Sequence, residues 1–376
     1  MNLVDLPTFD WIITVGKALF IFFVLFQVAP LMAWVERRGS ALMQNRLGPN
    51  RIGPLGLFQS VADGIKFLFK EDPVPGHVEK FYYSLAPIVS LVPAFMTFAV
   101  IPFASSIDLG DGRVINFQVA DLNVGLLYIL AISSLGVYGI IMAGWASNNK
   151  YAMLGSLRSS SQMISYELSM GLSIIGIIMT FSSVHLGEIA GAQSQALINL
   201  GAANLPFFGH TEFNIPKWGI FFQPLGFLIF MTATYAETNR LPFDLPEGEA
   251  EIVAGYHLEY GSMRFALFMM AEYVNMFAAS GLLVTLYFGG WQFPGLHHIL
   301  DSFQLQGMTR EWIRIAVEMG TFFIKVCFFM WVYVWVRWTI PRFRYDQVMD
   351  LGWKVMLPLS IVNVFLTALM INYGWI

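Results

Sequence analysis

Apolar residues are gathered into long runs along the chain, and most charged residues lie in the segments between these runs. A run of about 20 apolar residues is long enough to cross a hydrocarbon layer of about 30 Å as an α-helix. The pattern predicts an all-α polytopic membrane protein, a single membrane domain over residues 1–376 with about eight transmembrane helices. The expected spans are residues 12–34, 81–103, 122–146, 160–183, 218–237, 263–289, 315–338 and 354–374.

Lys and Arg residues are distributed unequally between alternate loops. The loops at 35–80, 147–159, 238–264 and 337–354 hold fifteen of them, whereas the opposite loops hold four. These four are Arg113, Lys217, Arg310 and Arg314. Because basic loops are retained in the cytoplasm, the asymmetry predicts that the first set is cytoplasmic and that both termini lie outside.

The first cytoplasmic loop has an amphipathic pattern, in which apolar and polar residues follow helical spacing in two neighbouring stripes. The apolar stripe is Phe58, Val61, Ile65 and Leu68, and the polar stripe is Gln59, Asp63, Lys66 and Lys70. This arrangement predicts a helix at about 55–70 that lies in the membrane interface. Its charged residues either are solvated on a surface anchor or form the wall of a cavity.

Composition narrows the functional class. Hydrophobic residues make up 56% of the chain and charged residues only 12%, which excludes an ordinary soluble domain. The formal net charge of −4 provides no basic field of the kind that holds nucleic acid, so a nucleic-acid partner is excluded. The single cysteine, Cys327, excludes an intramolecular disulfide, a Cys-ligated iron–sulfur cluster and a thiol zinc site within this chain. With no HExxH pattern present, no metal site is predicted.

Three acidic residues lie at graded depths in predicted spans. Glu167 is about seven residues into the fourth span, or about 10 Å deep, and Glu272 is about nine residues into the sixth, or about 14 Å deep. Glu237 closes the cytoplasmic end of the fifth. A charge inside the bilayer costs about 3 kcal/mol on insertion scales, so these acids are candidates for a functional role.

The segment from 237 to 259 contains six acidic residues and a single basic residue, Arg240. Crowded like charges raise one another's pKa and favour proton sharing. The segment is therefore either a solvated acidic loop or, together with Glu167 and Glu272, a proton-conducting cluster. Lys325 lies within the seventh span and shares a helix face with Glu318, which suggests a long-range pair or a charge bridged by water.

Four groups of motifs resemble one protein family throughout the cytoplasmic loops. They are ERR at 36–38 with QNRLGPN at 44–50 and AD at 62–63; GWASNNKY at 144–151 with SYE at 165–167; AETNRLPFDLPEGEAE at 236–251; and RW at 337–338 with PRFRYDQ at 341–347. On these motifs the chain resembles the quinone-chamber membrane subunits of respiratory complex I, the proton-pumping NADH:quinone oxidoreductase.

The resemblance implies two sets of site residues. Those expected to line or border the quinone chamber are Glu36, Arg37, Arg46, Asp63, Arg240, Glu247 and Glu249. Those expected to begin the proton path are Glu167, Glu237, Glu251 and Glu272, with Tyr166 and Tyr273. The substrate implied is ubiquinone or menaquinone, with no group bound covalently and no metal or iron–sulfur cluster in this chain.

The resemblance also implies an assembly in the bacterial inner membrane, in lipid. The partners would be the quinone-site and iron–sulfur subunits of the peripheral arm, and small membrane subunits that lead to antiporter-like subunits. The chain would serve as a subunit without a redox centre and would not be active alone. Two alternatives stay open, namely a membrane subunit of an energy-converting hydrogenase or related cofactor dehydrogenase, and a stand-alone ion or solute carrier.

The distribution of basic residues predicts which introduced cysteines can be labelled from outside the cell. A cysteine at Asp5 should react with an impermeant thiol reagent, whereas one at Glu249 should react only after the membrane is opened. Selective labelling of position 249 from the outside would overturn the predicted topology.

Overall fold

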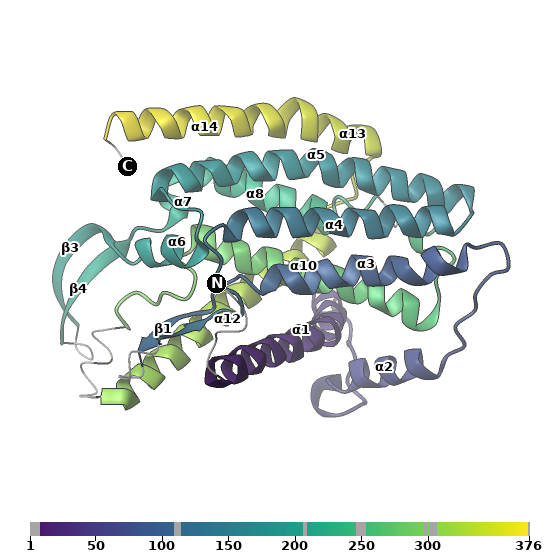
Figure 1. Ribbon diagram of the computed structural model, residues 1–376, viewed down its shortest axis with the longest axis horizontal. Coiled ribbons are helices and arrows are strands. Elements are labelled where there is room, and N and C mark those ends of the chain that lie inside the picture. The colour runs from purple at the N-terminus through teal and green to yellow at the C-terminus, as the bar shows by residue number, and fades with distance from the viewer. Residues whose placement is uncertain are drawn as a thin grey trace.

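The computed structural model describes residues 8–108, 114–205, 209–245, 253–296, 300 and 307–374. Helices make up most of it (Figure 1). The longer helices are α1 (Thr8–Met43), α3 (Lys80–Phe98), α4 (Gly125–Ala146), α5 (Lys150–Phe181), α8 (Pro224–Glu237), α10 (Ser262–Tyr287), α12 (Gly307–Thr339) and α14 (Leu357–Asn372). The shorter ones are η1 (Pro54–Gly56), α2 (Gln59–Phe69), α6 (Leu186–Ala192), α7 (Gly219–Phe222), η2 (Gly255–His257), α13 (Tyr345–Asp350) and the π-helical η3 (Leu351–Met356).

Seven helices within the described ranges are long and apolar enough to cross a membrane. The segment expected to form the fifth span differs, because it is divided at Gln223 into α7 and the 14-residue α8. Pro224 begins α8, and a proline has no backbone N–H with which to continue the hydrogen bonds of the preceding turn. The prediction of an all-α polytopic membrane protein with a helix in the first loop is confirmed, and that helix is α2.

The outward faces of the bundle are apolar. Ile12 and Leu19 of α1 are 69% and 64% exposed, and Phe365 of α14 is 67% exposed. Contiguous large apolar side chains at a surface mark contact with lipid or a partner, and helices satisfy their own backbone groups in such surroundings. The chain is accordingly a membrane protein.

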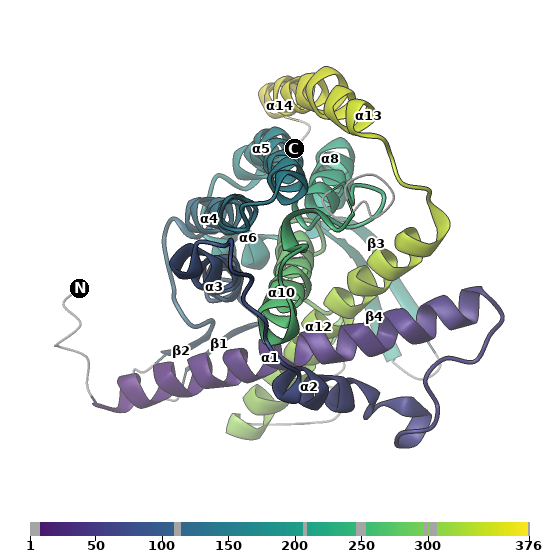
Figure 2. The ribbon, with the colours of Figure 1, turned by 90° about the vertical axis from the view of Figure 1, so that its right-hand side faces the viewer.

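Helix α10 lies at the centre of the bundle and contacts α1, α3, α8 and α12. Figure 2 shows α3, α4, α5 and α8 nearly end-on and α10 inclined to them, whereas α1 and α12 run across them at a steep tilt. The C-terminal helices α13 and α14 pack along α5 at the edge of this group. The inward-facing side chains of α10 include Val274 and Leu283 in the main hydrophobic core and Phe268 in a second, smaller cluster.

The outermost helix, α14, is joined to the bundle by buried polar side chains. Gln223 donates from Nε2 to Thr367 Oγ1 at 2.6 Å, and Asn363 donates from Nδ2 to Gln223 Oε1 at 3.0 Å. The helices approach closely because Gly176 lies here, where an added Cβ would be 2.7 Å from Gln223 Oε1. Small residues and interhelical hydrogen bonds are the usual means of joining helices within lipid.

Lys325 contacts backbone rather than an acidic side chain. Its ammonium group donates to the carbonyl oxygens of Phe288, Gly290 and Gln292 at 2.8, 3.1 and 2.8 Å, and it lies 4.8 Å from the centre of the Trp218 ring. These carbonyls follow the C-terminus of α10, where a cation is favoured by the helix dipole. Glu318 instead accepts hydrogen bonds from the backbone and hydroxyl of Ser105 at 2.9 and 2.6 Å, so the expected Glu318–Lys325 pair does not form.

Two small antiparallel pairs of strands lie at the end of the bundle that holds the start of α1. One pairs β1 (Ala104–Asp108) with β2 (Val114–Phe117), and the other pairs β3 (Ala196–Leu205) with β4 (Gly209–Pro216). The turn after α8, the short helix η2 before α10 and the loop that follows α1 lie at the opposite end. The predicted site residues are concentrated at that opposite end.

Candidate functional site

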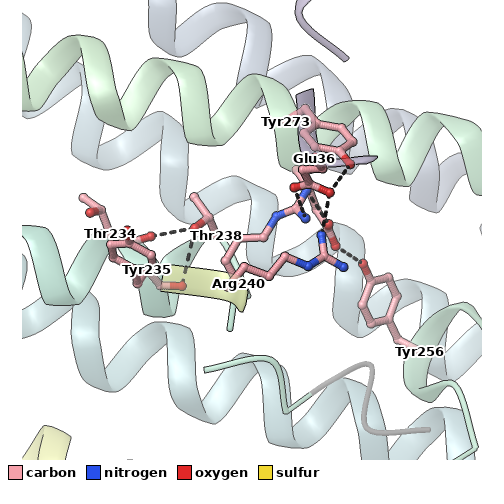
Figure 3. Close-up of polar contacts among 9 residues, drawn as sticks. Glu36, Thr234, Tyr235, Thr238, Arg240, Tyr256 and Tyr273 are labelled. Carbon is pink, nitrogen blue, oxygen red and sulfur yellow. Dashed lines mark hydrogen bonds and ion pairs between the residues drawn. The ribbon is translucent and has the colours of Figure 1, made fainter. Parts of the chain in front are cut away.

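The carboxylate of Glu36, near the C-terminal end of α1, is the centre of a buried ionic cluster (Figure 3). Arg240 donates to Glu36 Oε1 at 3.1 Å. Arg337 of α12 and the Tyr273 hydroxyl of α10 donate to Glu36 Oε2 at 2.6 and 3.0 Å. The guanidinium of Arg240 also lies 4.4 Å from the centre of the Tyr273 ring, a cation–π contact. One carboxylate therefore joins α1, α10, α12 and the turn after α8.

Glu272 extends the cluster along α10. Its Oε2 lies 3.5 Å from the second guanidinium nitrogen of Arg240, and its Oε1 accepts from the Tyr256 hydroxyl at 3.3 Å. Tyr256 is fully buried in η2, the short helix that precedes α10. This position requires a close approach to α5, because a Cβ on Gly155 would lie only 2.6 Å from the Cα of Gly255.

The turn that carries Arg240 is held by polar side chains of α5. Gln162 donates from one amide nitrogen to the carbonyl oxygens of Ala236 and Phe243 at 2.7 and 2.9 Å. Ser159 donates to Asn239 Oδ1 at 3.2 Å. The two ends of the turn are thereby fixed against α5, which sets the direction of Arg240.

Two residues predicted for the quinone chamber, Arg37 and Asp63, form a second and more exposed contact. Arg37 of α1 pairs with Asp63 of α2, and Gln59 donates to the other oxygen of Asp63 at 3.3 Å. No residue of α2 is buried within this chain, and its apolar side chains Val61 and Ile65 are 55% and 51% exposed. The pair thus anchors a surface helix whose apolar side is open to lipid, substrate or another subunit.

The other predicted site residues of the loops are Arg46, Glu247, Glu249 and Glu251. Arg46 is exposed in the turn after α1, where its backbone N–H donates to the carbonyl of Ala41 at 2.9 Å. Glu247, Glu249 and Glu251 lie outside the described residues.

Glu237, the last residue of α8, lines two small cavities. The volume that the centre of a water molecule can occupy is about 30 Å³ in one cavity and about 20 Å³ in the other. A volume of about 10 to 15 Å³ measured in this way is enough for one water. Glu272 lines the smaller cavity together with Tyr256, so two of the predicted acids face one water-sized space.

Glu167 of α5 is linked to the same region. It accepts a hydrogen bond from Ser134 of α4, and it is near enough to Glu237 for the two carboxyl groups to interact electrostatically. The neighbouring Tyr166 points elsewhere, since its hydroxyl donates to the carbonyl of Val348 at 2.9 Å. The structure therefore brings together the three acids of the spans, and it places Tyr166 in the contact between α5 and α13.

Sequence reasoning missed two members of the Glu36 cluster. Arg337 belongs to a basic group after an apolar run, which is the usual pattern of a helix end anchored at the membrane surface. Tyr256 is an uncharged residue in a loop, and no pattern of spacing linked it to Glu272. Among the residues that the structure describes, no three His, Cys, Asp or Glu side chains are grouped as metal ligands would be.

The fold and the site together define a polytopic membrane protein with a buried ionic cluster that adjoins carboxyl groups beside water-sized cavities. Residues 16–368 match the model of a family described as NADH dehydrogenase, and the chain belongs to this family. Its relatives include an NADH-quinone oxidoreductase subunit from Bdellovibrio bacteriovorus, 45% identical over 371 residues that cover 94% of this chain and 95% of that one. An NADH-quinone oxidoreductase subunit from Salinibacter ruber is 44% identical over 97% of both chains.

Removing the charge of Glu36 should destabilise the cluster, because the buried guanidinium of Arg240 and the partly exposed guanidinium of Arg337 would then lack its negative charge. For Glu36→Gln we expect a loss of about 3 kcal/mol or more, seen as a lower melting temperature and lower yield of assembled protein. Asp350→Asn, which breaks an exposed pair with Lys354, is the control and should change stability by less than about 1 kcal/mol. Wild-type stability of Glu36→Gln would show that the cluster does not hold these helices together.

Proposed function

We propose that the chain is the membrane subunit of a proton-translocating NADH:quinone oxidoreductase that forms a wall of the quinone chamber and begins the proton path. One observation carries this proposal. Glu272 contacts Arg240, a residue assigned to the chamber, and shares a cavity with Glu237, which is assigned to the proton path. A change of charge on the quinone side is thus one contact away from a titratable group on the proton side.

The chamber side has the chemistry that a quinone requires. A quinone head group has two carbonyl oxygens that accept hydrogen bonds, and guanidinium groups such as those of Arg37 and Arg240 donate them. The apolar residues of α2 that are exposed beside Asp63 are suited to an isoprenoid tail or to lipid. In the proposed complex, the electrons would come from iron–sulfur clusters held by the peripheral arm.

The proton side has the chemistry of a relay. Glu272, Glu237 and Glu167 come from three different helices, and water-sized cavities adjoin the first two. Carboxyl groups linked through ordered water can pass protons between them, and intramembrane acids of this kind mark proton relays in other pumps. We infer that this relay leads towards small membrane subunits and then to antiporter-like subunits in the inner membrane.

The names of the relatives support this assignment over its alternatives. Those from Bdellovibrio bacteriovorus, Salinibacter ruber and Cytophaga hutchinsonii are all named as subunits of NADH-quinone oxidoreductases, and the last is 45% identical over 92% of this chain. None of these three relatives is named as a subunit of an energy-converting hydrogenase or as a carrier.

Loss of the Arg37–Asp63 pair should alter the kinetics with quinone more than assembly. For Asp63→Ala we expect the apparent KM for a short-chain quinone to rise about fivefold, equivalent to about 1 kcal/mol for a half-exposed pair. Glu71→Ala removes an exposed acid just beyond α2 and should leave the KM unchanged. Wild-type KM and kcat in a fully assembled Asp63→Ala complex would return α2 to the role of a solvated anchor.

The proton path is tested by the double variant Glu167→Gln/Glu272→Gln, which keeps the shape of both side chains and removes both titratable protons. We expect either slower NADH-driven quinone reduction or fewer protons translocated per NADH in reconstituted vesicles, with both values normalised to assembled complex. Glu188→Gln changes an exposed acid of α6 and is the matched control. If turnover and pumping ratio both remain at wild-type values, these acids are structural.

A further inference from the structure

The two cavities beside Glu237 have part of their lining in common. Three residues line both of them, namely Glu237, Thr238 and Asn275. The smaller cavity contains Glu272, whereas the larger extends along Ser133 and Thr234. Any transfer of a proton between Glu272 and the larger cavity therefore passes these three residues, which we call the partition.

The side chains of two members of the partition have no hydrogen-bond donor that a carboxylate or an existing hydrogen bond does not already rule out. Glu237 has only carboxyl oxygens, and the hydroxyl of Thr238 already donates to the carbonyl of Thr234 at 2.8 Å. Asn275 is different, since its side-chain amide has no hydrogen-bond partner within the described part of the chain. A polar amide inside an apolar helix bundle is costly unless it is hydrogen-bonded, and a water in either cavity would satisfy it.

The position of Asn275 on α10 adds a second observation. It follows Glu272 by three residues, and side chains three apart lie on the same face of a helix. The same face continues to Ala278, which lines the larger cavity. Asn275 is thus placed between Glu272 and the larger cavity along α10, and its amide is open to both spaces.

We propose that Asn275 is a positioning residue that holds the water through which a proton passes between Glu272 and Glu237. The proposal rests on the proton path proposed above. The amide N–H₂ would donate to the water oxygen, or its Oδ1 would accept from the water, and either bond fixes the direction of the water's remaining groups. One carboxyl group gives a proton to the water while the water gives another proton to the second carboxylate, so the water is restored and one proton has moved.

The sharpest test compares two substitutions at this position. Leu has the same number of side-chain heavy atoms as Asn but no polar group, whereas Ala leaves room for an additional water. If the amide positions a water, Asn275→Leu should lower coupled quinone reduction at least about tenfold with an unchanged quinone KM, and Asn275→Ala should retain more activity. If the side chain only fills space, the order is reversed, because Ala creates a cavity and Leu does not.

Both variants are measured in the assembled complex, by NADH-driven quinone reduction and proton uptake in vesicles. Asn363→Leu is the control for loss of a buried asparagine, because it breaks the bond to Gln223 far from the partition. It should lower stability and leave the pumping ratio of the assembled complex unchanged.

Glu237→Gln is measured in parallel to separate the two proposals. Wild-type pumping by Glu237→Gln would mean that the proton path itself is misassigned. Impaired pumping by Glu237→Gln together with wild-type behaviour of Asn275→Leu, or with Ala more harmful than Leu, would overturn the role of Asn275 alone. Impaired Glu237→Gln with Leu more harmful than Ala is the result that we expect.

Discussion

A carboxylate inside an apolar bundle has to be neutralised by cations and hydrogen bonds, and at Glu36 this requirement organises the end of the bundle at which α1 terminates. Its partners Arg240, Tyr273 and Arg337 are separated from it by 204, 237 and 301 residues in sequence. Each comes from a different element, so the position of α1 relative to α10, α12 and the turn after α8 depends on one carboxyl group. Residues on both the proposed quinone side and the proposed proton side are attached to this cluster.

The same cluster places Arg240, a residue of the proposed quinone chamber, beside Glu272, a residue of the proposed proton path. Arg240 faces Glu36 and Glu272 together, and the hydrogen bonds of Gln162 hold its turn against α5. If a group on the proposed chamber side displaced Arg240, the carboxyl group of Glu272 would lose a neighbouring positive charge. This arrangement offers an electrostatic link between sites, and it needs no movement of a whole helix.

Much of this architecture could be predicted from the sequence, and the exceptions have physical reasons. An acidic residue inside an apolar run is unusual, and this alone marked Glu167 and Glu272 as candidates for a functional role. The division of the expected fifth span before Pro224 was not predicted, because a divided helix and a continuous helix can have the same apolar composition. The partners of Lys325 are backbone carbonyls, which every residue possesses, so no side-chain pattern marks them. Asn275 carries no charge, and only the cavities on both sides of it distinguish it.

The contacts of Lys325 have a consequence for how α10 and α12 can move relative to each other. Lys325 and Arg337 are twelve residues apart on α12, or about 18 Å. Lys325 binds the backbone that follows the C-terminus of α10, whereas Arg337 binds Glu36, which also accepts a hydrogen bond from Tyr273 near the middle of α10. Two attachments at this separation prevent one helix from sliding along the other. The attachment at Lys325 becomes a pivot if the one at Glu36 is released, and the ends of α10 and α12 nearest Glu36 would then swing apart in an arc while their other ends stay in register.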